Sequence, residues 1–196
     1  MSSGTGNDEE FLVQAGSLTV PTDWSTDGRF LAYQAIDSKT KMGWDLAFYS
    51  LAEKKTYVFL STLAAEVMGR FSPDGRWLAY TSDESGRPEV YVQPFPGHGG
   101  KWQISTAGGG QPVWNRNGKE LFYASADNKL MAVDVKADSS FEVGTPRALF
   151  DVHLKSINGW KYDISPDGQR FLANTVIEVK ANPITLVLNW AAEAKK

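Results

Sequence analysis

The chain repeats one short motif four times, and this repetition constrains the fold more than any single residue does. Each copy has a bulky apolar residue, then the glycine of a tight turn four positions on, then a short run of large apolar residues. The four glycines lie 47, 43 and 50 residues apart, a period suited to the four-stranded blade of a propeller. The copies are WSTDGRFLAY (24–33), FSPDGRWLAY (71–80), WNRNGKELFY (114–123) and ISPDGQRFLA (164–173).

The second copy shows why the motif favours a hairpin. Pro73 presets φ for the turn, and the Asp74 carboxylate can accept a hydrogen bond from the backbone two residues further on. Gly75 then takes a positive φ without a clash at Cβ. We therefore expect four strands in this repeat, at 69–72, 77–82, 89–93 and 102–105.

The same division applies to the other repeats. It places third strands at 45–50, 130–135 and 185–189, and fourth strands at 56–60 and 147–150. Residues 60–68 have a helix-forming composition, and we expect at most a turn or two of helix there. The fourth repeat has no outer strand of its own, whereas a spare strand at 11–14 precedes the first hairpin.

This mismatch predicts how the ends of the chain are used. Propellers avoid an exposed edge when one terminus completes the blade built by the other, so 11–14 should pair beside 185–189. The predicted fold is all-β, a β-propeller of four four-stranded blades over 11–190, after a disordered lead at 1–10 and before a tail at 191–196. The completing strand can come from the same chain or from a partner chain, as in a strand-exchanged homodimer that forms a larger ring.

The composition of the chain limits the classes of partner that we expect it to bind. With 20 basic and 23 acidic residues the net charge is -3, so no basic excess points to nucleic acid. No apolar stretch approaches the roughly 18 to 20 residues that span a bilayer, and we expect no membrane insertion. The opening MSSGTGNDEE lacks the features of a signal peptide, and the absence of cysteine leaves cytoplasmic and extracytoplasmic compartments both open.

The polar motifs do not predict a metal or a cofactor. None of the four acidic or amide turn residues has the neighbourhood of a calcium loop, so we interpret them as turn chemistry. His98 and His153 are too few to build a histidine zinc site without carboxylates. There is no G-x-S-x-G nucleophile motif, and the glycines at 108–110 lack the Walker pattern.

Most of the aromatic residues are expected to pack between blades. One column of the repeat holds Trp24, Phe71, Trp114 and Ile164, and another holds Tyr33, Tyr80 and Tyr123. Outside these columns, as the better candidates for exposed recognition, stand Trp44, Trp102 and Trp160, although Trp102 alternates with Ile104 in a pattern that also suits burial.

Two stretches carry a family resemblance, FSPDGRWLAYTSDESGRPEVYVQPFPG (71–97) and KWQISTAGGGQPVWNRNGKELFYAS (101–125). They resemble the WD-repeat-like, TolB-like β-propeller repeats of bacteria. Through PITLVLNW (183–190) the chain resembles, more narrowly, the C-terminal propeller that follows a membrane-linked serine/threonine kinase domain. The resemblance covers about residues 11–190 and implies a propeller, commonly with more than four blades. Kinase motifs such as HRD and DFG are absent from the sequence.

Propeller function usually lies around the channel, where the inner strands begin. Aligning the repeats puts these positions at 21–22, 68–70, 111–112 and 161–162. The candidate binding face drawn from them is Thr22, Arg70, Gln111, Lys161 and Tyr162.

Without a reactive constellation we hypothesise a non-catalytic binding or scaffold module for a protein or peptide, or for a small ligand in the channel. Such a module could be the sensor part of a larger bacterial signalling protein. The alternative class is an enzyme, either a propeller hydrolase or lyase or the gating propeller of a peptidase. A third reading is a ring that serves assembly alone.

Overall fold

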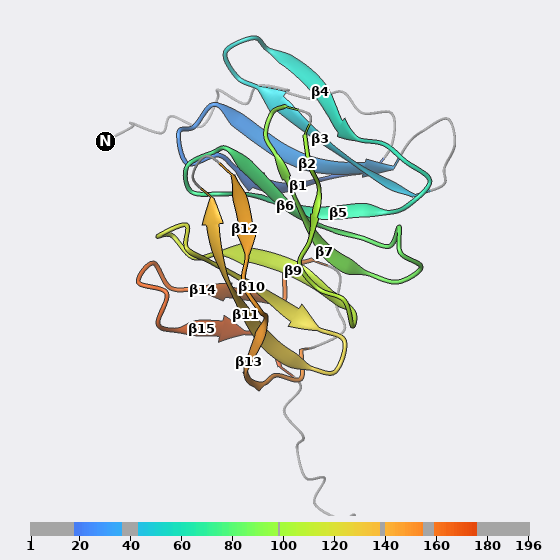
Figure 1. Ribbon diagram of the computed structural model, residues 1–196. Helices are drawn as coiled ribbons and strands as arrows, with labels where there is room; N and C mark the ends of the chain where they lie inside the picture. The colour runs from blue at the N-terminus through green and yellow to red at the C-terminus, as the bar shows by residue number, and fades with distance from the viewer. Residues whose placement is uncertain (1–17, 37–42, 98, 138–139, 155–158, 176–196) are drawn as a thin grey trace, which may run out of the picture.

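The computed structural model describes residues 18–36, 43–97, 99–137, 140–154 and 159–175, and within these ranges the chain forms strands and no helix. The strands make four antiparallel sheets that follow one another in chain order, from β1–β4 at one end to β14–β15 at the other (Figure 1). Each copy of the repeated motif forms the first hairpin of one sheet, so the all-β prediction and one sheet for each motif copy are confirmed.

The first two blades each have four strands in simple sequential order. Blade 1 consists of β1 (Thr19–Trp24), β2 (Phe30–Ile36), β3 (Trp44–Ser50) and β4 (Lys55–Leu60). Blade 2 consists of β5 (Glu66–Phe71), β6 (Trp77–Ser82), β7 (Glu89–Pro94) and β8 (Trp102–Gln103).

The last two blades differ from this pattern. Blade 3 consists of β9 (Gly109–Trp114), β10 (Glu120–Ser125), β11 (Lys129–Ala137) and β13 (Arg147–Asp151), with the extra strand β12 (Phe141–Val143) paired to the far end of β11. Blade 4 is described as the hairpin of β14 (Tyr162–Ile164) and β15 (Phe171–Ala173). The proposed pairing of 11–14 with 185–189 lies outside the described residues and stays a prediction.

The start of one inner strand was predicted wrongly, because Glu66 and Val67 pair with Ser82 and Thr81 and so begin β5 three residues early. No helix forms over 60–68, in agreement with the expectation of at most a turn or two there. Strand pairing here overrides a weak local propensity. The extra strand β12 was not predicted; it brings Phe141 to 4.8 Å from the ring of Trp77, between blades 2 and 3.

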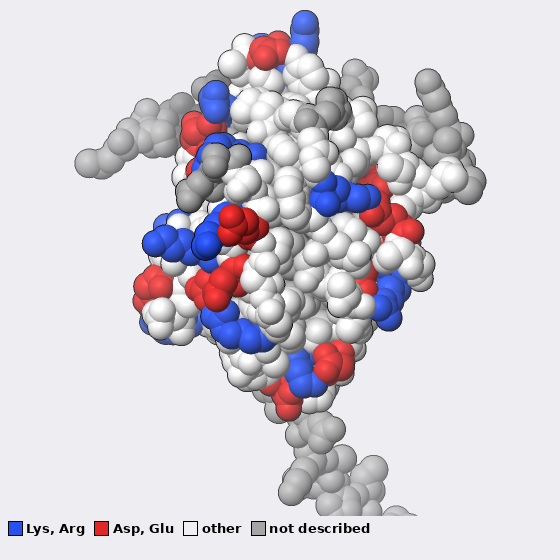
Figure 2. Space-filling model, in the orientation of Figure 1, with Lys and Arg blue, Asp and Glu red and all other residues white. Residues whose placement is uncertain are grey.

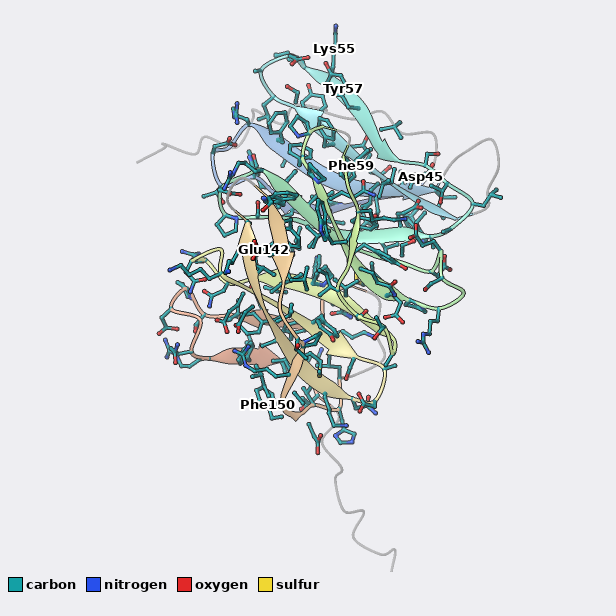
Figure 3. All side chains as sticks on the ribbon, viewed as in Figure 1. Asp45, Lys55, Tyr57, Phe59, Glu142 and Phe150 are labelled. Carbon is teal, nitrogen blue, oxygen red and sulfur yellow. The ribbon has the colours of Figure 1, made fainter. Side chains whose placement is uncertain are left out.

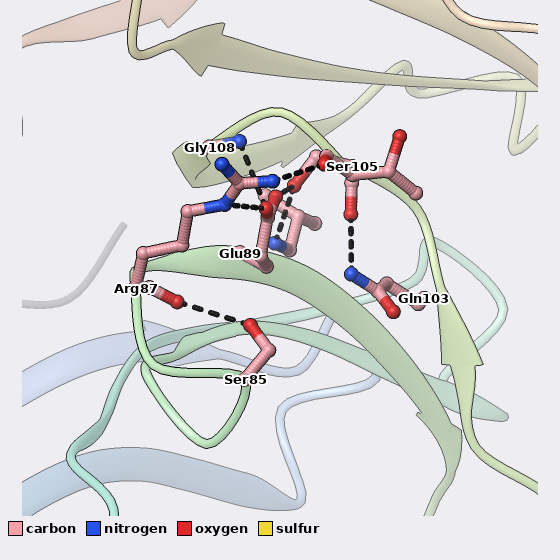
Figure 4. Close-up of polar contacts among 8 residues, drawn as sticks. Ser85, Arg87, Glu89, Gln103, Ser105 and Gly108 are labelled. Atoms are coloured by element: carbon pink, nitrogen blue, oxygen red, sulfur yellow. Dashed lines mark hydrogen bonds and ion pairs between the residues drawn. The ribbon is translucent and has the colours of Figure 1, made fainter.

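The outer strand of blade 2 was predicted over 102–105 but ends at Gln103, because the next residues bind a buried carboxylate (Figure 4). Glu89 is 1% exposed and accepts hydrogen bonds from the Arg87 guanidinium at 2.8 Å, the Gly108 N–H at 2.8 Å and the Ser105 hydroxyl. Ser105 in turn accepts from the Val90 N–H at 2.9 Å. The charge is thus fully paired, and it ties β7 to the segment that leads into blade 3.

The turns behave as the sequence predicts. In the second copy the Arg76 N–H donates to the Asp74 carboxylate at 3.1 Å, and Gly75 has a φ of 70°. In the first copy the Arg29 N–H and the Ser25 hydroxyl bind Asp27 in the same way and lower its pKa. The turn acids are therefore engaged by donors of their own turns.

Blades are held together by apolar cores that lie between them. In each core the last residue of one inner strand packs against the preceding blade. Phe71 packs with Leu46 and Phe48 of blade 1, and Trp114 packs with Ala79 and Val90 of blade 2. At the third interface Ile164 packs against the core formed by Phe122, Leu130 and Val113.

Trp24 does not follow its column. It is 56% exposed, whereas Phe71 and Trp114 are each 6% exposed, so the expectation of a packed core residue was wrong at this position. The physical reason is that no described blade precedes blade 1 and offers it a surface.

Glu66 is a buried carboxyl group that is only partly satisfied. It is 1% exposed; one carboxyl oxygen accepts the Thr62 hydroxyl, and the other has no partner among the described residues. Burial raises the pKa of Glu66, and the nearby charges of Asp45 and Glu84 add to this effect. The folded state therefore favours the neutral acid.

A Glu66→Gln substitution should change how stability depends on pH. Because the pKa of Glu66 is raised on folding, its favourable contribution is complete below the unfolded pKa and is lost as the pH rises through the folded value. From acidic to mildly alkaline pH, the unfolding free energy of the variant should therefore rise relative to that of the natural protein. Urea unfolding at a series of pH values measures this difference, and parallel curves for the two proteins would contradict it.

Candidate functional site

The inner strands are irregular near their beginnings, at the end of the blades where the sequence places a binding face. The pairing register shifts between Pro21 and Asp23 in β1 and between Val67 and Arg70 in β5. Met68 and Gln111 take positive φ values of 58° and 59° at equivalent positions of β5 and β9. Such bulges leave backbone groups without a ladder partner.

Side chains of the preceding blade bind these freed N–H groups. The Met68 N–H donates to Gln34 Oε1 at 2.9 Å, and the Gln111 N–H donates to Thr81 Oγ1 at 3.1 Å. Gln34 and Thr81 each follow the tyrosine that ends a motif copy. The third repeat has Ala124 there, which cannot accept, and Gln111 Oε1 instead accepts from the Lys161 N–H at 2.9 Å.

An arginine lies among the inner strands. Arg70 pairs with Asp23 at 3.4 Å, and its guanidinium carbon lies 3.9 Å from the ring centroid of Trp160. Arg70 Nε is buried without a partner among the described residues. Asp23 also accepts from the Phe71 N–H at 2.8 Å; burial raises its pKa, while Arg70 and this N–H oppose the shift.

An upper pocket of about 480 Å³ opens where the inner strands begin. Its lining is mainly apolar, and two polar groups stand out. Thr22 is 7% exposed, and its hydroxyl has no partner among the described residues, while Lys161 is the charged residue of the lining. The apolar lining includes Val20, Pro21, Trp44, Val67, Met68 and Trp160.

A lower pocket of about 470 Å³ lies where the inner strands end. It is lined by both charges, with Arg70 and Arg116 against Asp23 and Asp163, and by the exposed face of Trp24. Trp160 lines the upper pocket and Arg70 lines the lower one, so the contact between these two side chains connects the two pockets.

The five residues of the predicted face lie in three places. Thr22 and Lys161 line the upper pocket, and Arg70 lines the lower one. Gln111 and Tyr162 are 6% and 4% exposed, and the Tyr162 hydroxyl donates to the Gln111 carbonyl at 2.7 Å. These last two join blade 3 to blade 4.

Two of the three tryptophans singled out from the sequence reach the upper pocket, Trp44 and Trp160. Trp102 instead packs 5.5 Å from Trp77 between blades 2 and 3. Sequence reasoning missed Asp23, although the residue before the apolar column reads Asp23, Arg70, Val113 and Asp163 across the repeats. That column of opposite charges was the available signal.

Charges on the visible face are mixed, with acidic and basic side chains next to one another (Figure 2). Within the described ranges, no group of three or more histidine, cysteine, aspartate or glutamate side chains is placed to hold a metal ion. His153 is exposed beyond β13, and His98 lies outside the described residues. Nor does any helix of the described chain have the length and apolarity to cross a membrane.

No protein-family model and no curated protein matches the sequence. Solved structures do match in fold. TolB from Acinetobacter baumannii has a TM-score of 0.66 at 18% identity, over 86% of this chain and 40% of that one. A candidate TolB from Agrobacterium tumefaciens has a TM-score of 0.57 at 19% identity, over 70% and 51%. An oligogalacturonate lyase in complex with manganese has a TM-score of 0.61 at 13% identity, over 86% and 50%.

The chain is thus structurally similar to TolB-like β-propellers and to other propeller proteins, and it spans about half the length of these structures. At such identities the likeness concerns the fold alone.

Removing the acceptor on Gln34 should weaken the joint between blades 1 and 2. Gln34→Leu leaves the Met68 N–H unpaired, which should lower the unfolding free energy by about 1 kcal/mol. Gln169→Leu is the control, because Gln169 is exposed and uses only its backbone N–H in the turn; it should stay within about 0.5 kcal/mol. Equal denaturation midpoints for both variants would contradict this role of Gln34.

Proposed function

We propose that the protein is a non-catalytic binding module that takes a segment of a protein or peptide into its upper pocket. The observation that carries the proposal is the pocket's combination of an apolar lining with one ammonium group and one buried, unpartnered hydroxyl. Its volume of about 480 Å³ falls in the usual range for ligand sites, roughly 300 to 1,000 Å³.

The lining suggests the chemistry of the ligand. Trp44, Met68 and Trp160 offer apolar and aromatic surface to a large apolar side chain. Lys161 would pair with a carboxylate next to that side chain, and the Thr22 hydroxyl would gain a partner on modest rearrangement. A peptide with an apolar residue beside an acidic one or beside its C-terminus fits this description.

Backbone hydrogen bonds support a preformed pocket. Met68 and Lys161 are both fixed through their N–H groups, by Gln34 and Gln111 of the preceding blades. A wall held in this way loses little conformational freedom when a ligand binds.

The wider role is part of the same proposal. The repeats resemble the propeller that follows a kinase domain in bacterial signalling proteins, and the chain spans about half of the solved propellers it matches. We place the module in such a setting, as the sensor or interaction part of a larger assembly.

Selection of peptides from a phage-displayed library tests the proposal. Lys161→Glu should weaken the best peptide at least tenfold, which corresponds to about 1.4 kcal/mol, and Trp44→Ala should weaken it by a similar factor. Lys55→Glu is the matched control, since Lys55 lies on β4 at the outer edge of blade 1, away from the pocket (Figure 3). Affinities come from fluorescence anisotropy.

Two results would count against the module. If neither Lys161→Glu nor Trp44→Ala weakens binding, the peptide contacts a part of the protein other than the upper pocket. A tightly bound metal in elemental analysis, or hydrolysis of ester or lactone substrates above the buffer rate, would favour the competing class, a propeller hydrolase or lyase.

A further inference from the structure

In the described part of the chain, the inner strand of blade 1 lacks the packing that its equivalents have. Phe71 and Trp114 are each 6% exposed because each packs on the blade before it. Trp24, at the same repeat position, is 56% exposed.

Blade 4 has an exposed apolar residue on its opposite face, where a following blade would pack. The second strand of each hairpin has one residue that faces the following blade, and in the first three blades it is buried: Ala32 at 2%, Ala79 at 0% and Phe122 at 3%. Leu172 holds this position in β15 and is 79% exposed.

These two positions meet at every interface inside the chain. Ala32 shares a core with Phe71, Ala79 shares one with Trp114, and Phe122 belongs to the core that Ile164 packs against. Trp24 and Leu172 are therefore the two halves of one more interface of the same kind. Both are exposed, so neither covers the other within one chain.

We propose that a second copy of this chain supplies the missing partner, with Trp24 of each copy packing on Leu172 of the partner subunit. Two copies related by a two-fold axis would bury the Trp24 and Leu172 side chains of both copies in one closed arrangement. The chain matches 40% of one propeller and 50% of another, so two copies provide about the length of one such ring.

The contact should be centred on the inner strand. On the same side of blade 1, Tyr33 and Tyr49 are already buried, at 7% and 6% exposed, so the free apolar surface is that of Trp24. Val20 pairs with Gln34 on the other face of the sheet and lines the upper pocket. Trp24 also lines the lower pocket, and the partner subunit would complete that wall. This inference does not depend on what the upper pocket binds.

Mass in solution is the first test. By light scattering, the protein should have twice the 21.6 kDa mass of one chain. Trp24→Asp and Leu172→Asp should each reduce it to a single chain, because each places a charge in the apolar contact. Leu63→Asp is the control; Leu63 is 87% exposed between blades 1 and 2 and should leave the dimer intact. Circular dichroism checks that all variants fold.

A monomer at the highest soluble concentration would overturn the proposal. So would a dimer that resists both substitutions, because its contact would lie elsewhere.

Cross-linking distinguishes two copies from a self-closed ring. The chain has no cysteine, so Trp24→Cys and Leu172→Cys introduce the only thiols. A mixture of the two single variants treated with a short bismaleimide should give a covalent heterodimer, whereas Leu63→Cys mixed with Leu172→Cys should not. In the double variant, a product linked only within one chain would overturn the proposal in favour of closure by a single copy.

Discussion

The structure depends on one constraint, that a small twisted sheet has two apolar faces and cannot bury both by itself. Each blade covers one face of its neighbour, and the contact is made by an aromatic or branched residue at the end of the next inner strand. Phe71 and Trp114 are buried by this packing, whereas Trp24 is exposed because no described blade packs against it. Stability is therefore shared between neighbours, and the first and last blades are the places where another surface is needed.

The same contact shapes the candidate site. The inner strands β5 and β9 bulge near their starts, where they meet the preceding blade, and the bulges free backbone N–H groups at Met68 and Gln111. Because an unpaired N–H is costly when buried, a side chain of the preceding blade must accept each bond. Gln34 and Thr81 do so. The bond from Gln34 fixes the start of β5, which lines the upper pocket, so this part of the site is a consequence of how the blades are joined.

Three carboxyl groups, buried at Glu89 and Glu66 and half-buried at Asp23, show how differently the fold treats charge. Glu89 has donors for both oxygens and ties blade 2 to the segment that leads into blade 3. Asp23 combines a long ion pair with a backbone bond across the joint between blades 1 and 2. Glu66 keeps one oxygen unpaired, and burial raises its pKa. The two least satisfied groups, Glu66 and Asp23, both lie on inner strands, near the part of the molecule that could bind a partner.

From the sequence alone, the repeat, the four hairpins, the turn chemistry and most of the interblade columns could be predicted, because they follow from local rules of φ, hydrogen bonding and periodicity at Asp74, Gly75 and their equivalents. The tertiary structure decided what depends on distant neighbours. It placed Gln111 and Tyr162 in a joint and left Thr22 and Lys161 at a pocket. It paired Asp23 with Arg70 across 47 residues and left Trp24 exposed. Whether a side chain lines a pocket, bonds two blades together or stays exposed depends on which blade lies against it. No local sequence pattern contains that information.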